Sequence, residues 1–302
     1  MEHLLWALVT STGFFFILCL KLKAIIDGES VLNKSPLVYG KTNRFGGPDM
    51  QKALRYTDEK SDKFWRIETA GCELVTNWGK TGTTGRYEIK NFDTEDECEK
   101  QASKLVRSKE KKGYTDMQDF DAMHHLYFDT DEYGLHPLTS HPVFRTCFSE
   151  ELYYDCGDEE APFGSDDGND TLHFLEESIR KRPKMCVADF PELLIVKEWN
   201  LTYLPPEPEQ TDGELKTQAA QTYHGLKGDQ TLLQTDQVIL ATVFGQIKIM
   251  GKLDEALQVL GFRSLMRMER MYRLLWNWDK EEPPYNISIM RRDLERFVNR
   301  DC

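Results

Sequence analysis

The stretch Phe64-Trp65-Arg66-Ile67-Glu68, followed by Asn77-Trp78-Gly79-Lys80-Thr81-Gly82 and then Gly85-Arg86, decides the fold. Polar and apolar side chains alternate along it, which is the pattern of a half-buried β-strand. Residues 86–92 alternate in the same way. The glycines between these runs are typical of a turn. These patterns predict a sheet whose strands are joined by a short Gly-rich turn.

A helix is predicted directly after the sheet. Thr94 and Glu97 form a capping-box pattern, which begins a helix, and Gly113 is expected to end it. A helix face that is apolar along its length is expected to cover the sheet. The apolar residues of this helix share one face: Cys98, Ala102, Leu105 and Val106.

This arrangement resembles the WGR domain. The module occurs in eukaryotic poly(ADP-ribose) polymerases and in many bacterial proteins similar to regulators of molybdate metabolism. The resemblance runs from about Leu54 to Tyr114. Its features occur in the family's order: Lys63-Phe64-Trp65-Arg66-Ile67, Trp78-Gly79-Lys80, Gly82, Gly85, the strand end at Phe92, and Lys111-Lys112-Gly113-Tyr114.

The resemblance implies a binding site on one face of the module. In the polymerases this face meets broken DNA ends, with the tryptophan packing on the terminal nucleotide and an arginine nearby. It would place Trp78 and Lys80 in those roles, and lysine keeps the charge while losing the planar fork that holds phosphate bidentately. The predicted nucleic-acid or partner site is Trp78, Gly79, Lys80, Arg86 and Lys63. The alternative is that Trp78 only fills the core beneath the turn, as we expect for Trp65.

Charge is distributed unevenly along the chain. The 302 residues carry a formal net charge of −13, which argues against a general nucleic-acid binder. Residues 51–115 hold 14 Lys/Arg and 12 Asp/Glu, whereas residues 116–302 hold 19 and 35. A module that is close to neutral therefore precedes a strongly acidic remainder, which is suited to a basic protein partner.

The N-terminal region contains an uncharged apolar run from Leu4 to Leu20. Its length is close to the lower limit for a helix that spans a bilayer, and Lys21 and Lys23 follow it. The positive-inside rule would then place the rest of the chain in the cytoplasm, tethered to the membrane. The alternatives are a buried hydrophobic helix or a translation start placed too early. Residues 1–23 are thus a hydrophobic segment, and residues 24–50 are expected to form a linker.

The remainder is predicted to be mostly helical. Residues 116–135 form an acidic connector and residues 136–302 an acidic helical domain, with a linker at 205–228. Helices are expected over 171–182, 187–199, 236–250 and 289–300, and another begins at Asp254. Parts of residues 134–260 resemble an uncharacterised bacterial family that is sometimes joined to WGR modules. That resemblance implies no activity.

Other candidate sites are weaker. The loop Ser165-Asp166-Asp167-Gly168-Asn169-Asp170 offers Asp166, Asp167 and Asp170 to a hard cation, but its order is wrong for an EF-hand. Capping of the next helix by Asn169 or Asp170 is the preferred interpretation. His124, His125, His136 and His141 match no zinc signature and are expected on exposed loops. The seven cysteines are expected to be reduced thiols.

The sequence therefore predicts an α+β protein, in which a WGR-like antiparallel sheet with one covering helix precedes a mostly helical acidic domain. We expect a binding or adaptor protein that recognises nucleic-acid ends. The alternative is a membrane-tethered protein-interaction module that binds no nucleic acid. No nucleophile elbow, P-loop or dinucleotide fingerprint is present, and nothing resembles an ADP-ribosyltransferase domain. We therefore expect no enzymatic activity and no cofactor.

Overall fold

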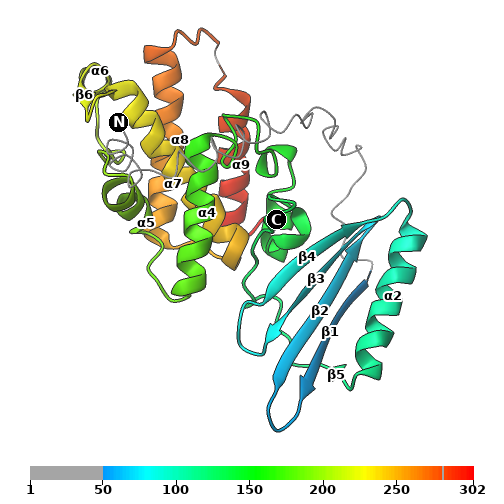
Figure 1. Ribbon diagram of the computed structural model, residues 1–302. Helices are drawn as coiled ribbons and strands as arrows, with labels where there is room; N and C mark the ends of the chain where they lie inside the picture. The colour runs from blue at the N-terminus through cyan, green and yellow to red at the C-terminus, as the bar shows by residue number, and fades with distance from the viewer. Residues whose placement is uncertain (1–49, 281) are drawn as a thin grey trace, which may run out of the picture. The chain divides into compact units, whose positions relative to one another are not determined.

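The structure is a computed structural model that describes residues 50–280 and 282–302. These residues form the predicted α+β fold, in which a sheet precedes a set of helices (Figure 1). The hydrophobic segment expected at 1–23 lies outside the described residues, as does the linker expected at 24–50 except for its last residue. Among the helices that are described, none is both long and apolar enough to cross a membrane.

The first part is a five-stranded sheet whose paired strands are antiparallel, in the order β4-β3-β2-β1-β5 (Figure 1). The strands are β1 (Met50–Thr57), β2 (Asp62–Ala70), β3 (Glu73–Lys80), β4 (Arg86–Asn91) and β5 (Thr115–Asp116). Strands β2, β3 and β4 coincide with the alternating stretches of the sequence. Strand β1 mixes polar and apolar residues without a clear period, and the sequence alone does not predict it.

Helix α2 (Glu95–Lys111) covers one face of this sheet. It begins as predicted, because the Thr94 side chain accepts a hydrogen bond from the backbone N–H of Glu97. Its acidic first turn and basic last turn both suit the helix dipole. The core between helix and sheet is made of Leu54, Trp65, Ile67, Leu74, Cys98, Ala102 and Val106.

The second part is built around α7 (Gly228–Met250), a helix that is buried on almost every side. Helices α4 (Asp166–Lys181) and α8 (Glu255–Leu275) both pack on it, and α9 (Tyr285–Asn299) packs on α8. Helix α7 ends at Gly251 as predicted, but it begins eight residues before the predicted start. The smaller elements are η1 (Pro137–Thr139), α3 (Pro142–Cys147), η2 (Glu151–Tyr153), α5 (Phe190–Glu192) and η3 (Leu193–Glu198), the last a π-helix.

Two further expectations for this part, a linker and a helix cap, differ from the structure. The linker expected at 205–228 contains α6 (Asp212–Ala219) and the short hairpin of β6 (Thr222–Tyr223) and β7 (Leu226–Lys227). Only Leu215 of α6 is buried, so the polar sequence gives little helical periodicity to detect. The N-cap of α4 is Ser165, which accepts from the Gly168 N–H, and neither Asn169 nor Asp170 caps this helix.

The expectation that all cysteines are reduced is wrong for two of them. A disulfide joins Cys147, at the end of α3, to Cys302 at the C-terminus. These residues are 155 positions apart in the chain, so no local spacing indicates the pair. Among the described residues, Cys72, Cys98, Cys156 and Cys186 take no part in a disulfide.

Candidate functional site

Strand register brings the predicted site residues together on one face of the sheet. Lys63 of β2 lies opposite Lys80 of β3, and Trp78 of β3 lies opposite Arg86 of β4. Positions 78 and 80 are two residues apart, so their side chains leave the same face. Trp65, which lies opposite Trp78, belongs to the core under α2. The side chains of Lys63, Trp78, Lys80 and Arg86 therefore all project from the sheet face that α2 covers.

A hollow of about 380 Å³ lies at this point of the sheet. Residues of the β3–β4 turn and its two flanks line it: Trp78, Gly79, Thr83, Thr84, Gly85 and Arg86. Of the five predicted site residues, Trp78, Gly79 and Arg86 line the hollow. Lys63 and Lys80 form the register pair next to that of Gly79 and lie outside the lining.

The glycines allow the backbone of the turn to approach the strand closely. A Cβ atom at Gly79 would lie 2.8 Å from the Cα of Gly85. Gly85 has a φ of +71° and would place a Cβ 2.7 Å from the carbonyl oxygen of Trp78. Asn77 fastens the turn, because its Nδ2 donates hydrogen bonds of 3.1 Å to the carbonyl oxygens of Thr84 and Arg86. The hollow is thus a fixed feature of the turn.

The two tryptophans have different environments. Trp65 is 3% exposed and belongs to the core, as predicted. Trp78 is half-buried and packs against the edge of that core, which leaves part of its ring on the wall of the hollow. An aromatic ring that is held from below and accessible at its rim is suited to stacking or edge packing against a planar ligand.

Three cations lie at or next to the register position of Trp78 on the same face of the sheet. Lys63, Lys80 and Arg86 are exposed, and none of them has a carboxylate partner within the described part of the chain. The neighbouring Arg55 behaves differently, since it binds Asp62 through two hydrogen bonds of 2.8 and 2.7 Å. The local positive charge of the hollow is therefore available to an anionic ligand.

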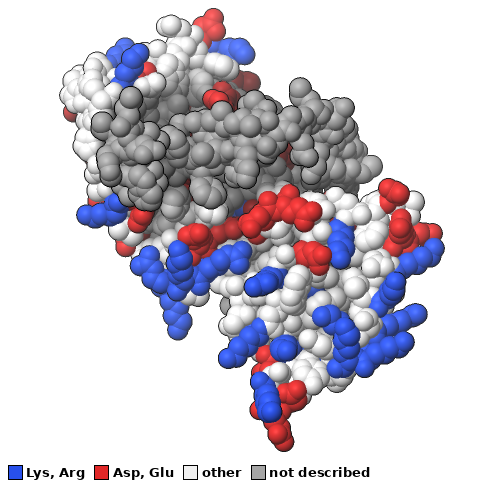
Figure 2. All heavy atoms as spheres, viewed as in Figure 1, with Lys and Arg blue, Asp and Glu red and all other residues white. Residues whose placement is uncertain are grey.

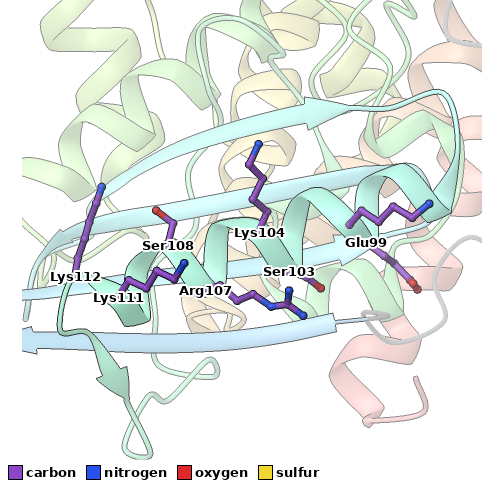
Figure 3. A pocket seen from close by; sticks show the side chains of 8 residues that line it. Glu99, Ser103, Lys104, Arg107, Ser108, Lys111 and Lys112 are labelled. Atoms are coloured by element: carbon purple, nitrogen blue, oxygen red, sulfur yellow. The ribbon is translucent and has the colours of Figure 1, made fainter.

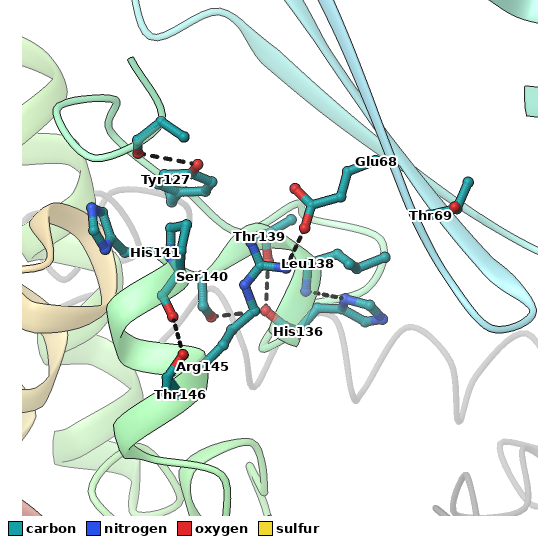
Figure 4. A network of polar contacts seen from close by, with 12 residues as sticks. Glu68, Thr69, Tyr127, His136, Leu138, Thr139, Ser140, His141, Arg145 and Thr146 are labelled. Atoms are coloured by element: carbon teal, nitrogen blue, oxygen red, sulfur yellow. Dashed lines mark hydrogen bonds and ion pairs between the residues drawn. The ribbon is translucent and has the colours of Figure 1, made fainter. Parts of the chain in front are cut away.

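A polar network that the sequence does not indicate lies on the opposite face of the sheet. Alternation predicts Arg66 and Glu68 on a solvent-facing side, but they are 1% and 0% exposed. Residues 120–145 cover them, and the Glu68 carboxylate forms ion pairs with Arg66 and with Arg145 of α3. Figure 4 shows the pair with Arg145. The Arg66 guanidinium also lies over the rings of Phe120 and Tyr127.

His125 connects this covered face to the turn. Its Nε2 lies 2.8 Å from Oδ1 of Asn77. The amide nitrogen of the same asparagine donates hydrogen bonds to the backbone of the turn. Burial, with a contribution from the Arg66 charge, lowers the pKa of His125 to about 4. At neutral pH the ring is therefore uncharged and donates this hydrogen bond to the asparagine.

The histidines predicted on exposed loops divide into two groups. His124 is exposed and pairs with Asp121, whereas His136 and His141 are buried. The Nδ1 atoms of these two accept hydrogen bonds from the backbone N–H groups of Leu138 and Val143, and so cap η1 and α3. Figure 4 shows the cap that His136 makes. In each buried ring, one nitrogen is therefore satisfied by a helix end.

The weak metal candidates lie in the first two turns of α4. Asp167 accepts a hydrogen bond from Gln234, and burial raises its pKa. Burial also raises the pKa of Asp170. Within residues 50–280 and 282–302, no group of three or more His, Cys, Asp or Glu side chains is placed to hold a metal ion.

Comparison with known proteins gives the following matches. Residues 50–121 match the family model of the WGR domain. The chain is 41% identical over 248 residues to the uncharacterised protein YfeS of Escherichia coli K12, which covers 82% of this chain and 98% of YfeS. It is 46% identical over 61 residues to the protein YehF of the same organism, covering 20% of this chain and 22% of YehF. A crystal structure from Bacteroides fragilis matches 42% of this chain and 39% of its own at 24% identity, with a TM-score of 0.23.

Proposed function

Because the chain belongs to the same family as YfeS and contains a WGR domain, we propose that it is a binding protein that recognises nucleic-acid ends through this domain. The observation that carries the proposal is the hollow at the β3–β4 turn, where half-buried Trp78 lies opposite Arg86 and next to the Lys63–Lys80 register pair, and these three exposed cations form no ion pair among the described residues. The proposal assigns binding and no catalytic step.

The chemistry of the hollow fits a terminal nucleotide. The Trp78 ring offers an apolar surface to a base or sugar that is exposed at a strand end, and such stacking does not depend on sequence. Lys63, Lys80 and Arg86 can each contact phosphate oxygens, which position a nucleic acid without reading its bases. An end is favoured over continuous duplex because only an end exposes an unstacked planar face.

The charge of the whole chain sets the conditions for binding. The acidic part beyond residue 115 repels a phosphate backbone, and salt screens this repulsion beyond about 8 Å at physiological ionic strength. Attraction at the hollow is also salt-dependent, because about three phosphate contacts release about three counterions. We therefore expect weak binding that falls further as the salt concentration rises.

Fluorescence anisotropy of a labelled nicked duplex with full-length protein tests this function. Trp78→Ala should weaken binding about tenfold, because it removes one stacking contact. Trp199→Ala is a matched control, since it also removes a half-buried tryptophan but from the helical part. Equal affinities for the parent protein, Trp78→Ala and Trp199→Ala would exclude the hollow as the binding site.

Two substitutions of Lys80 test the site further, because they are expected to change binding in opposite directions. Lys80→Arg restores the planar fork that can hold a phosphate through two hydrogen bonds, so binding should become tighter. Lys80→Gln removes the charge and should weaken binding. If both variants bound as the parent protein does, Lys80 would have no contact with the nucleic acid.

A further inference from the structure

The solvent-facing side of α2 carries a row of cations. Lys100, Lys104, Arg107 and Lys111 follow one another at intervals of four, three and four residues, which places them on one side of the helix. The residues of α2 that face the sheet are Cys98, Ala102 and Val106. Figure 2 shows basic side chains gathered where α2 lies in Figure 1. We call these four residues the basic stripe.

The basic stripe has no carboxylate partner. Its four side chains are exposed and form no ion pair or side-chain hydrogen bond within the part of the chain that the structure describes. Glu110, which is also on α2, is occupied by Lys52 at 2.8 Å. Like charges three or four residues apart on a helix repel one another, so neighbouring cations of the stripe repel one another along its length.

A hollow of about 720 Å³ runs along the stripe. All of its lining residues come from α2 and its C-terminal end, and Figure 3 shows how their side chains spread from the helix. Ser103 and Ser108 add hydroxyl groups that can donate hydrogen bonds to an anion. The complete lining is Glu99, Lys100, Ser103, Lys104, Arg107, Ser108, Lys111 and Lys112.

We propose that the basic stripe binds the phosphate backbone of duplex nucleic acid. This inference rests on the proposed function in one respect, namely that the duplex is the one whose end occupies the hollow at Trp78. Helix α2 lies on the sheet face from which Trp78 projects, so both surfaces are on the same side of the sheet. The end is bound by the turn, and the flanking duplex is bound by α2.

The dimensions of the stripe suit this ligand. Eleven residues of α-helix rise about 16 Å, and one strand of a duplex places a phosphate about every 3.4 Å along the axis. Four cations along this length can therefore reach phosphates of one strand over about five nucleotides.

The composition of the lining argues against other anionic partners. A protein partner is bound chiefly by aromatic or aliphatic anchors in pockets, and the lining contains only charged residues and serines. A helix that lies on a membrane surface inserts an apolar face, whereas the apolar face of α2 is occupied by the sheet. Phosphate groups need only charge and hydrogen-bond donors, which is what this surface provides.

The test uses full-length Lys104→Gln/Arg107→Gln and anisotropy with intact and nicked duplexes across a salt series. Loss of two phosphate contacts should weaken binding to both duplexes about tenfold and reduce the slope of log affinity against log salt by about 1.8. The preference for the nick should remain. Lys197→Gln/Lys216→Gln is the matched control, because it removes two exposed cations without ion pairs from the helical part.

The outcomes separate this inference from the proposed function. An unchanged affinity and salt slope in Lys104→Gln/Arg107→Gln would overturn the inference, as would equal losses in the control. Displacement of the duplex by polyglutamate at similar concentration would also overturn it, since the stripe would then bind acidic polypeptide as well. A reduced slope without any preference for the nick would support the stripe while contradicting the role of Trp78 at an end.

Discussion

At the scale of single residues, Asn77 connects the β3–β4 turn to the covered face of the sheet. Its amide nitrogen fastens the turn that forms the hollow, and its carbonyl oxygen accepts from His125 on the covered face. The geometry of the candidate site therefore depends on a histidine that lies 48 positions further along the chain. Protonation of His125 would leave intact the two hydrogen bonds that the Asn77 amide nitrogen donates, but it would place a positive charge beside the buried Arg66.

His125 makes stability depend on pH. Its pKa is about 4 in the folded protein and about 6.5 when unfolded, so the unfolded chain takes up the proton first as pH falls. The contribution of His125 to the free energy of unfolding is fully present above pH 6.5 and is lost as pH falls toward 4. At pH 5 we expect the free energy of unfolding to be about 2 kcal/mol lower from this group than at pH 8.

Comparison with His125→Gln by urea unfolding isolates this effect. The comparison is needed because titration of Glu176 changes the free energy of unfolding in the opposite direction as pH falls. Burial raises the Glu176 pKa to about 7, so its contribution favours the folded state as pH falls from about 7 toward the ordinary range. The difference between parent and variant should shrink on acidification from pH 8 to pH 5. Parallel profiles would show that His125 does not titrate as described.

Residues of the candidate site differ in how well the sequence predicts them. Trp78, Gly79 and Arg86 are singled out by motif, and the structure places them together at the β3–β4 turn, because alternation and a turn are local patterns. Arg66 and Glu68 follow the same alternation and are nevertheless buried, because Arg145 neutralises Glu68 from 77 positions away. A local pattern does not contain that partner.

At the scale of elements, the β3–β4 turn depends on Gly85 more than on Gly82. Both have positive φ, at +71° and +83°. A Cβ at Gly85 would lie 2.6 Å from Cζ of Phe64, whereas a Cβ at Gly82 would meet nothing within 4 Å. Gly82→Ala should cost about 1–2 kcal/mol from its backbone conformation alone.

Gly85→Ala should therefore destabilise the protein more than Gly82→Ala does. It combines the same backbone cost with overlap in a packed region, and overpacking alone costs about 1–3 kcal/mol. Urea unfolding of the two variants measures the difference. Equal losses would mean that Phe64 and the turn can move apart, and that the close approach at Gly79 is not required.

The elements also show where sequence prediction succeeds. Helices α2, α7 and α8 are predicted because they combine a long periodic pattern with end signals, such as Thr94 and Gly251. Helix α6 is not predicted, since only Leu215 marks its buried side. The caps of η1 and α3 by His136 and His141 are not predicted, because the residues expected at a helix N-cap are serine, threonine, asparagine and aspartate.

At the scale of the whole molecule, the Cys147–Cys302 disulfide attaches the C-terminus to α3. A crosslink that closes so long a loop restricts the unfolded chain, and its reduction should lower the free energy of unfolding by about 2–4 kcal/mol. Dithiothreitol should therefore destabilise the parent protein but leave Cys302→Ser unchanged. Cys186→Ser serves as the control because Cys186 is exposed and free. Equal stability of the parent protein with and without reductant would contradict this role.

Charge at this scale distinguishes the two parts of the chain. The sheet and α2 present exposed cations without partners, while the remainder carries most of the acidic excess. Such a division is consistent with binding of an anion by the first part and with low affinity for nucleic acid in general. Sequence analysis detects this division directly, because charge counts need no knowledge of the fold.

The preference of full-length protein for a 5′-phosphorylated nicked duplex over an intact duplex, both with their ends closed by hairpin loops, tests the central claim most directly. Both duplexes have the same sequence and the same charge density along the helix, so general electrostatic attraction cancels in the ratio of their affinities. The account predicts tighter binding to the nick, and loss of this preference in Trp78→Ala but not in Trp199→Ala. Equal affinity for the two duplexes, or a preference that persists in Trp78→Ala, would contradict it.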